Sequence, residues 1–107
     1  MKPVQFLGDS LDRLREFPDG ARRQMGFQIE RVQRGLDPND WKPLKFVGPG
    51  AREIRVRDTA GAFRVIYVAN IANAVYVLHA FQKKTQATAK RGIDLAVFRY
   101  KTLLRKY

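Results

Sequence analysis

Residues 51–84 read AREIRVRDTAGAFRVIYVANIANAVYVLHAFQKK, and their pattern predicts a sheet. In its first strand the side chains alternate, so that Ile54 and Val56 face one way and the charged side chains face the other. Residues 62–71 and 74–81 are apolar on both faces, as strands in the middle of a sheet are. Short turns separate the three segments, which therefore predict an antiparallel meander.

Helical periodicity flanks the meander on both sides. A short strand at 3–8 precedes two predicted helices, 11–17 and 19–35, which form a hairpin around a proline. Apolar residues in 93–104 make one stripe of a C-terminal helix, whereas residues 37–50 are predicted as a loop. The expected fold class is α+β in the order (β)ααβββα. The helical hairpin and the C-terminal helix then pack on a small antiparallel β-sheet.

Length and composition limit the class of protein. The chain has 107 residues, and we expect a single domain over 1–107. It contains no cysteine, which excludes disulfides and thiolate metal sites and is compatible with a reducing cytoplasm. No apolar run is long enough for a signal peptide or a membrane span. We therefore expect a cytoplasmic protein with no membrane partner.

The charge of the chain is strongly positive and unevenly distributed. Twenty-one Lys and Arg against ten Asp and Glu give a net charge of +11. Residues 1–40 hold seven basic and seven acidic side chains, whereas residues 41–107 hold fourteen basic and three acidic ones. Such an excess favours a polyanion such as nucleic acid as the partner, because each neutralised phosphate releases counterions. A basic protein without a nucleic-acid role is the alternative.

Several ordered motifs resemble one protein family. Residues 63–67 read FRVIY and residues 78–85 read LHAFQKKT, and an amphipathic helix follows; WKP at 41–43 and GPG at 48–50 lie upstream. This sequence resembles the RelE/ParE superfamily of type II toxin–antitoxin toxins, and most of all its HigB-like, phage-derived branch. The resemblance extends over residues 3–105 and implies a RelE-like fold.

The resemblance also implies an activity and a set of partners. RelE and HigB toxins enter the ribosomal A site and cut messenger RNA there, as the 2′-hydroxyl attacks the neighbouring phosphate. The implied function is that of a ribosome-associated endoribonuclease, an mRNA interferase that needs no metal or other cofactor. The implied partners are mRNA, ribosomal RNA and a cognate antitoxin, which is often a helix-turn-helix protein.

Four side chains are candidates for the chemistry, which needs groups that offset phosphate charge and groups that move protons. Arg64 matches an active-site arginine of the family, and Lys83 and Lys84 match its basic position at the end of the last strand. His79 is the only histidine, and imidazole exchanges protons near neutral pH. The alternatives are a structural ion pair for Arg64, a core position for His79 and a solvated surface for the lysines.

Five further side chains are predicted to bind RNA: Arg55, Arg57, Lys42, Lys45 and Phe81. Arg55 and Arg57 lie two apart on one strand, so both side chains emerge on the same face and can hold phosphate. Phe81 can stack on a base. A solvated strand face and core packing are the alternative roles. Glu53 departs from the family pattern, since some RelE-like toxins have a basic residue at about this point.

Two other functions remain open. ParE-like members of the same superfamily inhibit DNA gyrase and cut no RNA, and fold cannot separate the two activities. The chain could also be a non-catalytic, basic RNA-binding phage protein, whose binding would weaken with salt without any cut ends.

Overall fold

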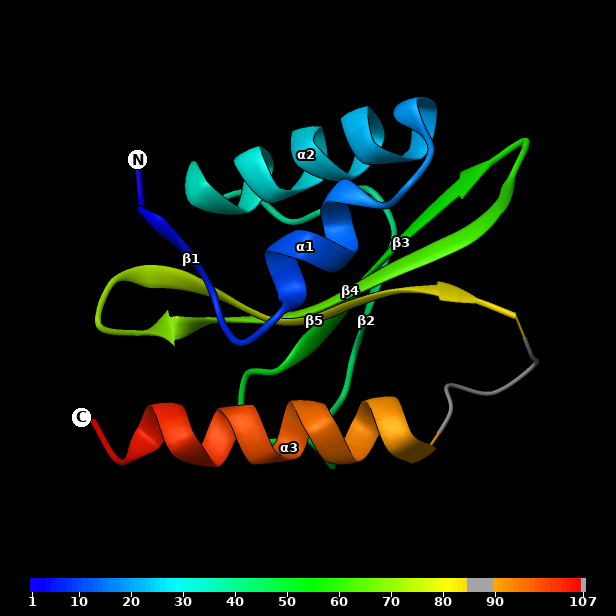
Figure 1. The fold of residues 1–107 in the computed structure, drawn as a ribbon. Coiled ribbons are helices and arrows are strands. Elements are labelled where there is room, and N and C mark those ends of the chain that lie inside the picture. The colour runs from blue at the N-terminus through cyan, green and yellow to red at the C-terminus, as the bar shows by residue number, and fades with distance from the viewer. Residues whose placement is uncertain (85–89, 107) are drawn as a thin grey trace.

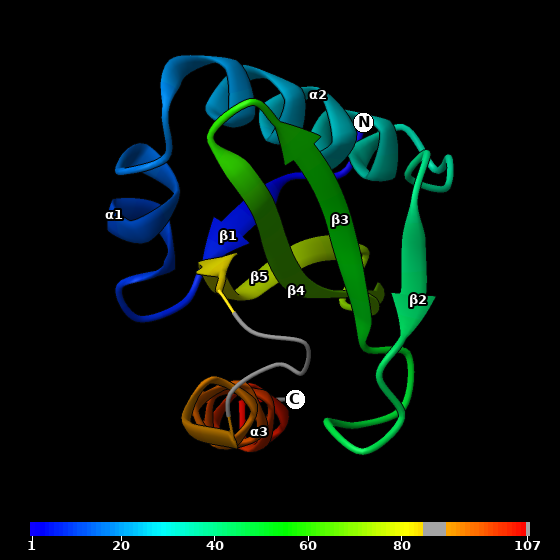
Figure 2. The same ribbon diagram turned by 90° about the vertical axis from the view of Figure 1, so that its right-hand side faces the viewer.

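The computed structural model describes residues 1–84 and 90–106. One sheet lies between two layers of helices, with α1 and α2 on one face and α3 on the other (Figures 1 and 2). The elements in chain order are β1 (Val4–Phe6), α1 (Ser10–Arg15), α2 (Asp19–Gln33), β2 (Trp41–Pro43), β3 (Arg52–Asp58), β4 (Gly61–Ile71), β5 (Ala74–Lys83) and α3 (Lys90–Leu104). The predicted α+β architecture is confirmed.

The sheet has the strand order β1-β5-β4-β3-β2. Strands β3, β4 and β5 form the predicted antiparallel meander. The sheet as a whole is mixed rather than antiparallel throughout, because β1 pairs with β5 in parallel. The chain between these two strands is long enough for the crossover that parallel pairing needs. The segment predicted as a loop contains β2, which pairs with β3 in the register Trp41 opposite Ile54.

Two backbone features set the ends of the elements. Gly35 has φ +83 just after α2, where its N–H donates to the carbonyl of Val32 and the N–H of Leu36 donates to that of Arg31. This pair of hydrogen bonds is typical of a helix that ends at a residue in the left-handed conformation. Ala72 and Asn73, with φ of 51 and 53, form the two-residue turn between β4 and β5, as a type I′ hairpin requires.

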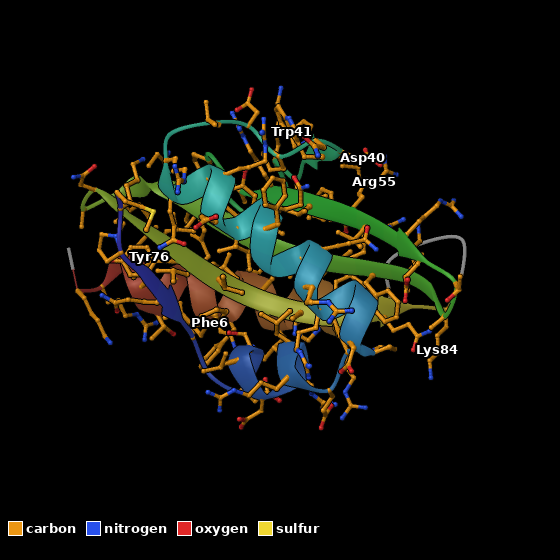
Figure 3. All side chains as sticks on the ribbon, turned by 90° about the horizontal axis from the view of Figure 1, so that it is seen from above. Phe6, Asp40, Trp41, Arg55, Tyr76 and Lys84 are labelled. Carbon is orange, nitrogen blue, oxygen red and sulfur yellow. The ribbon has the colours of Figure 1, made fainter. Side chains whose placement is uncertain are left out.

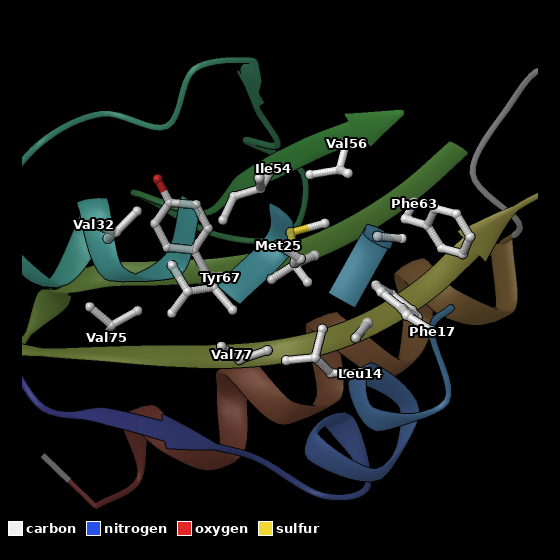
Figure 4. Close-up of a cluster of buried hydrophobic side chains, with 14 residues drawn as sticks. Leu14, Phe17, Met25, Val32, Ile54, Val56, Phe63, Tyr67, Val75 and Val77 are labelled. Atoms are coloured by element: carbon white, nitrogen blue, oxygen red, sulfur yellow. The ribbon is translucent and has the colours of Figure 1, made fainter. Parts of the chain in front are cut away.

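The main core lies between the sheet and the helices α1 and α2. Met25 of α2 is fully buried against Tyr67 of β4, and the rings of Phe17 and Phe63 lie 4.8 Å apart (Figure 4). Burial of side chains of this size supplies most of the driving force for docking the two helices.

A second core lies between the sheet and α3. Ala96, Tyr100 and Leu103 are buried there, and the Tyr100 hydroxyl donates to the carbonyl of Pro49 at 2.6 Å. Leu104, which the predicted stripe includes, is 47% exposed, so Leu103 takes the buried position instead. Leu44 of the loop after β2 is also part of this core.

A bulge in β5 changes which residues share a face. Tyr67 lies opposite Val77 and Ile66 lies opposite His79, so Leu78 is the extra residue. Leu78 and His79 therefore both lie on the face covered by α3, where Gly92 of α3 passes close to the His79 ring. Regular alternation along 74–81 predicts that His79 shares a face with Val77, and the bulge makes that prediction wrong.

Candidate functional site

Basic side chains from three strands meet on the α3 face of the sheet. In the register, Lys42 of β2 lies opposite Glu53 of β3, and Arg55 of β3 lies opposite Arg64 of β4. Glu53 is also opposite Ile66, which belongs to the core under α3, so these side chains emerge on that face. We call Lys42, Glu53, Arg55, Arg64 and the neighbouring Lys83 the Glu53 cluster.

The Glu53 carboxylate is at the centre of this cluster. Its Oε1 lies 3.5 Å from Nε of Arg64, 3.8 Å from Nζ of Lys42 and 4.0 Å from Nε of Arg55. The side chain of Glu53 has no exposed surface and that of Arg64 is 7% exposed, whereas those of Arg55 and Lys42 are 34% and 42% exposed. Glu53 and Arg64 therefore form the floor of the cluster, and Arg55 and Lys42 form its rim.

The electrostatics connect Lys83 to the same cluster. Partial desolvation lowers the pKa of Lys83; the positive charges of Arg64, Lys42 and Arg55 lower it further, while Glu53 opposes them. Burial is also the largest cause of the lowered pKa of Arg64, against which the charge of Glu53 acts. Both shifts have the direction expected where several cations lie close together. An added anion such as a phosphate would relieve this repulsion.

His79 lies outside the Glu53 cluster. Its ring stacks on that of Phe81, with centroids 5.2 Å apart and 19° between the planes. Burial lowers its pKa below the ordinary value of 6.5, the charges of Arg99 and Arg13 lower it further, and that of Asp9 raises it. The imidazole is therefore mainly neutral at pH 7 and can accept a proton.

A cleft of about 940 Å³ adjoins the cluster at the end of β5. Strand β1 pairs with β5 only as far as Val77, and the cleft is lined by residues 79–82 of β5 together with residues from α1 and α3. His79 and Lys84 line it, as does Phe81, which lies directly opposite Arg64 in the β4–β5 register. Phe81 therefore connects the cleft with the Glu53 cluster.

The remaining predicted residues lie at the surface. Arg57 is exposed near the end of β3, and its charge contributes to the lowered pKa of Arg64. Lys45 is exposed in the turn after β2 and is not part of the Glu53 cluster. Lys84 is exposed at the cleft, at the far end of β5 from β1 (Figure 3). Thr85 of the LHAFQKKT motif lies outside the described residues.

Sequence reasoning missed the part that acidic residues play. Glu53 stands out only as a departure from the family pattern, although its position in the alternation already places it on the same face as Arg55. Asp40 is 66% exposed and lies 3.9 Å from Arg55, near which Figure 3 shows it, and it is not one of the residues of the Glu53 cluster. Arg99 of α3 bonds Asp9 at 2.7 Å, a contact between residues 90 positions apart that no local pattern predicts.

None of the described helices is both long and apolar enough for a membrane crossing. Within residues 1–84 and 90–106, no three His, Asp or Glu side chains are grouped so that they could hold a metal ion.

Comparisons with known proteins agree with this description. Residues 12–101 match the family described as phage derived protein Gp49-like (DUF891). An arginine double mutant of the Escherichia coli toxin RelE in the free state has a similar structure, with a TM-score of 0.69, 19% identity, and coverage of 92% of this chain and 96% of that one. The isolated E. coli RelE toxin is also similar, with a TM-score of 0.65, 14% identity, and coverage of 99% and 98%.

No curated protein sequence matches the chain. The family match covers most of the chain, and both structural matches cover nearly all of it, so the resemblance stated from the sequence is confirmed in family and fold. The chain belongs to the Gp49-like family of phage-derived proteins and has a RelE-like fold.

Proposed function

We propose that this protein is the toxin of a type II toxin–antitoxin pair and acts as an endoribonuclease on messenger RNA at the ribosome. The observation that carries the proposal is the Glu53 cluster, in which cations from several strands of a RelE-like sheet converge on one face. The match to the Gp49-like family and the fold shared with the E. coli toxin RelE support the same function.

Phosphate binding is the first task of the cluster. Arg55 and Lys42 at the rim are accessible and can contact phosphate oxygens directly. Arg64 at the floor acts mainly through its charge, which is effective over a few ångströms where water is scarce. Lys83 adds a cation whose repulsion by its neighbours falls when the phosphate arrives.

Proton transfer is the second task. In the proposed reaction the 2′-oxygen forms a bond to phosphorus, the bond from phosphorus to the 5′-oxygen breaks, and a 2′,3′-cyclic phosphate and a 5′-hydroxyl result. The 2′-hydroxyl loses one proton and the leaving 5′-oxygen gains one. Neutral His79 in the adjoining cleft can accept the first proton, and Lys84 at the cleft surface can donate the second.

RNA contacts extend beyond the reacting phosphate. Phe81 and His79 stack on each other and both line the cleft, where an aromatic ring can receive a base. Arg57 and Lys45 are exposed and add charge for messenger or ribosomal RNA. We propose a cytoplasmic location and a cognate antitoxin as partner on the strength of the family alone.

A ribosome-dependent cleavage assay tests the proposal. Primer extension on a reporter messenger in a purified translation reaction should show discrete new 5′ ends with the protein, and none without ribosomes. Arg64→Ala and Lys83→Ala should abolish them. Arg23→Ala is the matched control, because it removes an exposed cation from α2, outside the site. An intact messenger together with cleaved DNA trapped on gyrase would transfer the assignment to the ParE-like function. RNA binding without cut ends would leave a non-catalytic RNA-binding protein.

A further inference from the structure

Arg55 and Arg64 are placed in a way that like charges normally avoid. They occupy directly opposite positions on β3 and β4, where like charges destabilise a sheet. Arg64 is in addition almost buried. An arrangement of this kind needs a counter-charge close to both guanidinium groups.

Glu53 supplies that counter-charge from the buried floor of the cluster. Its Oε1 lies nearest to the Nε atom of each guanidinium, at 3.5 Å for Arg64 and 4.0 Å for Arg55. A guanidinium carries five N–H donors in one rigid plane. Neither Nε atom has a hydrogen-bond partner among the described residues, so the carboxylate attracts the two guanidinium groups through its charge and leaves donors of the terminal nitrogens for other acceptors. Because Glu53 has no exposed surface, it cannot touch RNA itself.

We propose that Glu53 is a positioning residue that holds Arg64 and Arg55 side by side, so that Arg55 donates to the RNA phosphate while the charge of Arg64 lies close beneath it. The inference rests on the proposed nuclease function. Lys42, opposite Glu53 in the register and 3.8 Å from it, completes the group held by the carboxylate. Glu53 thus supports the phosphate site from within a basic strand, although its own negative charge repels phosphate.

The positioning role and a simple charge effect predict opposite results for Glu53→Gln, which keeps the shape and removes the charge. If Glu53 only weakened the positive field, Glu53→Gln would bind RNA more tightly and cleave it at least as fast. If it positions the arginines, kcat falls about 10- to 100-fold, as small misplacements of catalytic groups do, and KM does not fall. Glu53→Asp, which keeps the charge, should recover part of the lost kcat.

Asp40→Asn is the matched control. It removes a negative charge 3.9 Å from the same Arg55, but from an exposed side chain outside the cluster. We expect kcat to stay within about twofold of the wild type, as for other exposed ion pairs. A fall in kcat equal to that of Glu53→Gln would overturn the positioning role, because any lost charge would then suffice.

The decisive experiment uses the intact protein and two independent readouts. The first is the ¹⁵N–¹H NMR spectrum of the arginine Nε–H groups, with the Arg64 and Arg55 signals assigned by Arg64→Lys and Arg55→Lys. In Glu53→Gln both signals should shift and exchange faster with water, while the backbone amide spectrum stays folded. Unchanged Nε–H signals would overturn the proposal whatever the enzyme does. If Glu53→Gln does not fold, Glu53→Asp is used instead, and its shorter side chain should shift the same two signals by a smaller amount; no shift at all would overturn the proposal.

The second readout is the cleavage assay with its separate kcat and KM values. If the wild type cuts no RNA while the Nε–H signals respond as expected, the nuclease function fails but Glu53 still organises the arginines. Binding of a short DNA oligonucleotide, which lacks the 2′-hydroxyl, then tests whether the arginines held by Glu53 bind a phosphate backbone. Affinity for it should rise or stay level with Asp40→Asn and fall with Glu53→Gln. A rise with both variants would refute the positioning role.

Discussion

Arg99 links three parts of the fold, and its replacement tests how α3 is held. Its guanidinium donates to Asp9 Oδ1 at 2.7 Å in the loop before α1, and to the carbonyl of Leu78 at 2.8 Å in the β5 bulge. The Arg99 side chain is only 12% exposed. Gly8 lies so close that an added Cβ would come within 2.5 Å of the guanidinium. We predict that Arg99→Met is strongly destabilising.

The size of the effect follows from the two bonds. Hydrogen bonds that involve a charged group contribute about 1.5–3 kcal/mol each. Asp9 is 43% exposed, so water compensates part of that bond, whereas the carbonyl of Leu78 lies deeper under α3. A total loss of about 3 kcal/mol in the free energy of unfolding is reasonable, which for a domain of this size lowers Tm by roughly 12–24 °C.

Urea unfolding followed by circular dichroism measures this loss, with Lys101→Met as the control. Lys101 is an exposed cation on the same helix, and its replacement should change stability by less than about 0.5 kcal/mol. The bond to Arg99 is also the largest cause of the lowered pKa of Asp9. Wild-type stability should therefore fall as the pH drops below about 4, and less so in Arg99→Met. A loss below 1 kcal/mol, or an unchanged acid dependence, would refute the reasoning.

Three further predictions concern single residues. Because burial lowers the pKa of His79, the unfolded chain binds a proton at this residue more readily than the folded protein does. Stability should therefore decrease from pH 7.5 to pH 5.5, and His79→Gln should make that decrease smaller in urea titrations. Because its pKa is lowered, Lys83 loses its charge at a lower pH than an ordinary lysine as the pH is raised, and affinity for a DNA oligonucleotide should fall with that charge. Lys83→Arg should shift this loss of affinity to a higher pH, and fluorescence anisotropy measures both. Gly48→Ala should lower the free energy of unfolding by about 1–3 kcal/mol, because its Cβ would lie 2.6 Å from the Tyr100 ring. The Cβ of Gly26→Ala would meet nothing within 4 Å, so this control should not destabilise the protein in thermal unfolding.

Local patterns predicted those parts of the fold that depend on neighbours in sequence. The alternation around Ile54 and Val56, the two doubly apolar strands and the turn at residues 72–73 are all short-range signals, and each element lies where they indicate. In α3 the stripe was right for Ala96 and Tyr100 but included Leu104. Leu103 and Leu104 both fit a helical period at the end of the stripe, and only the packing against the sheet decides between them.

Three features could not be predicted in this way, because each depends on pairing between distant segments. Strand β2 has three residues including Pro43, too few for a period of two to be visible. The bulge at Leu78 leaves no mark in an apolar run, yet it moves His79 to the other face of the sheet. The parallel pairing of β1 with β5 joins segments about seventy residues apart in the register Val4 opposite Val75.

The candidate site depends both on local alternation within a strand and on the pairing of distant strands. The alternation in β3 places Glu53 and Arg55 on one face, but their partners Lys42 and Arg64 are set by the register of β2 and β4. A one-residue slip in either pairing would move a partner to the opposite face of its strand. The cluster is thus a property of strand register, which the fold can provide whatever side chains occupy the paired positions. Function has to be argued from the side chains that the register brings together. Substitutions that alter the charges of the Glu53 cluster and preserve the sheet are therefore the ones that can separate RNA cleavage from other uses of a RelE-like fold.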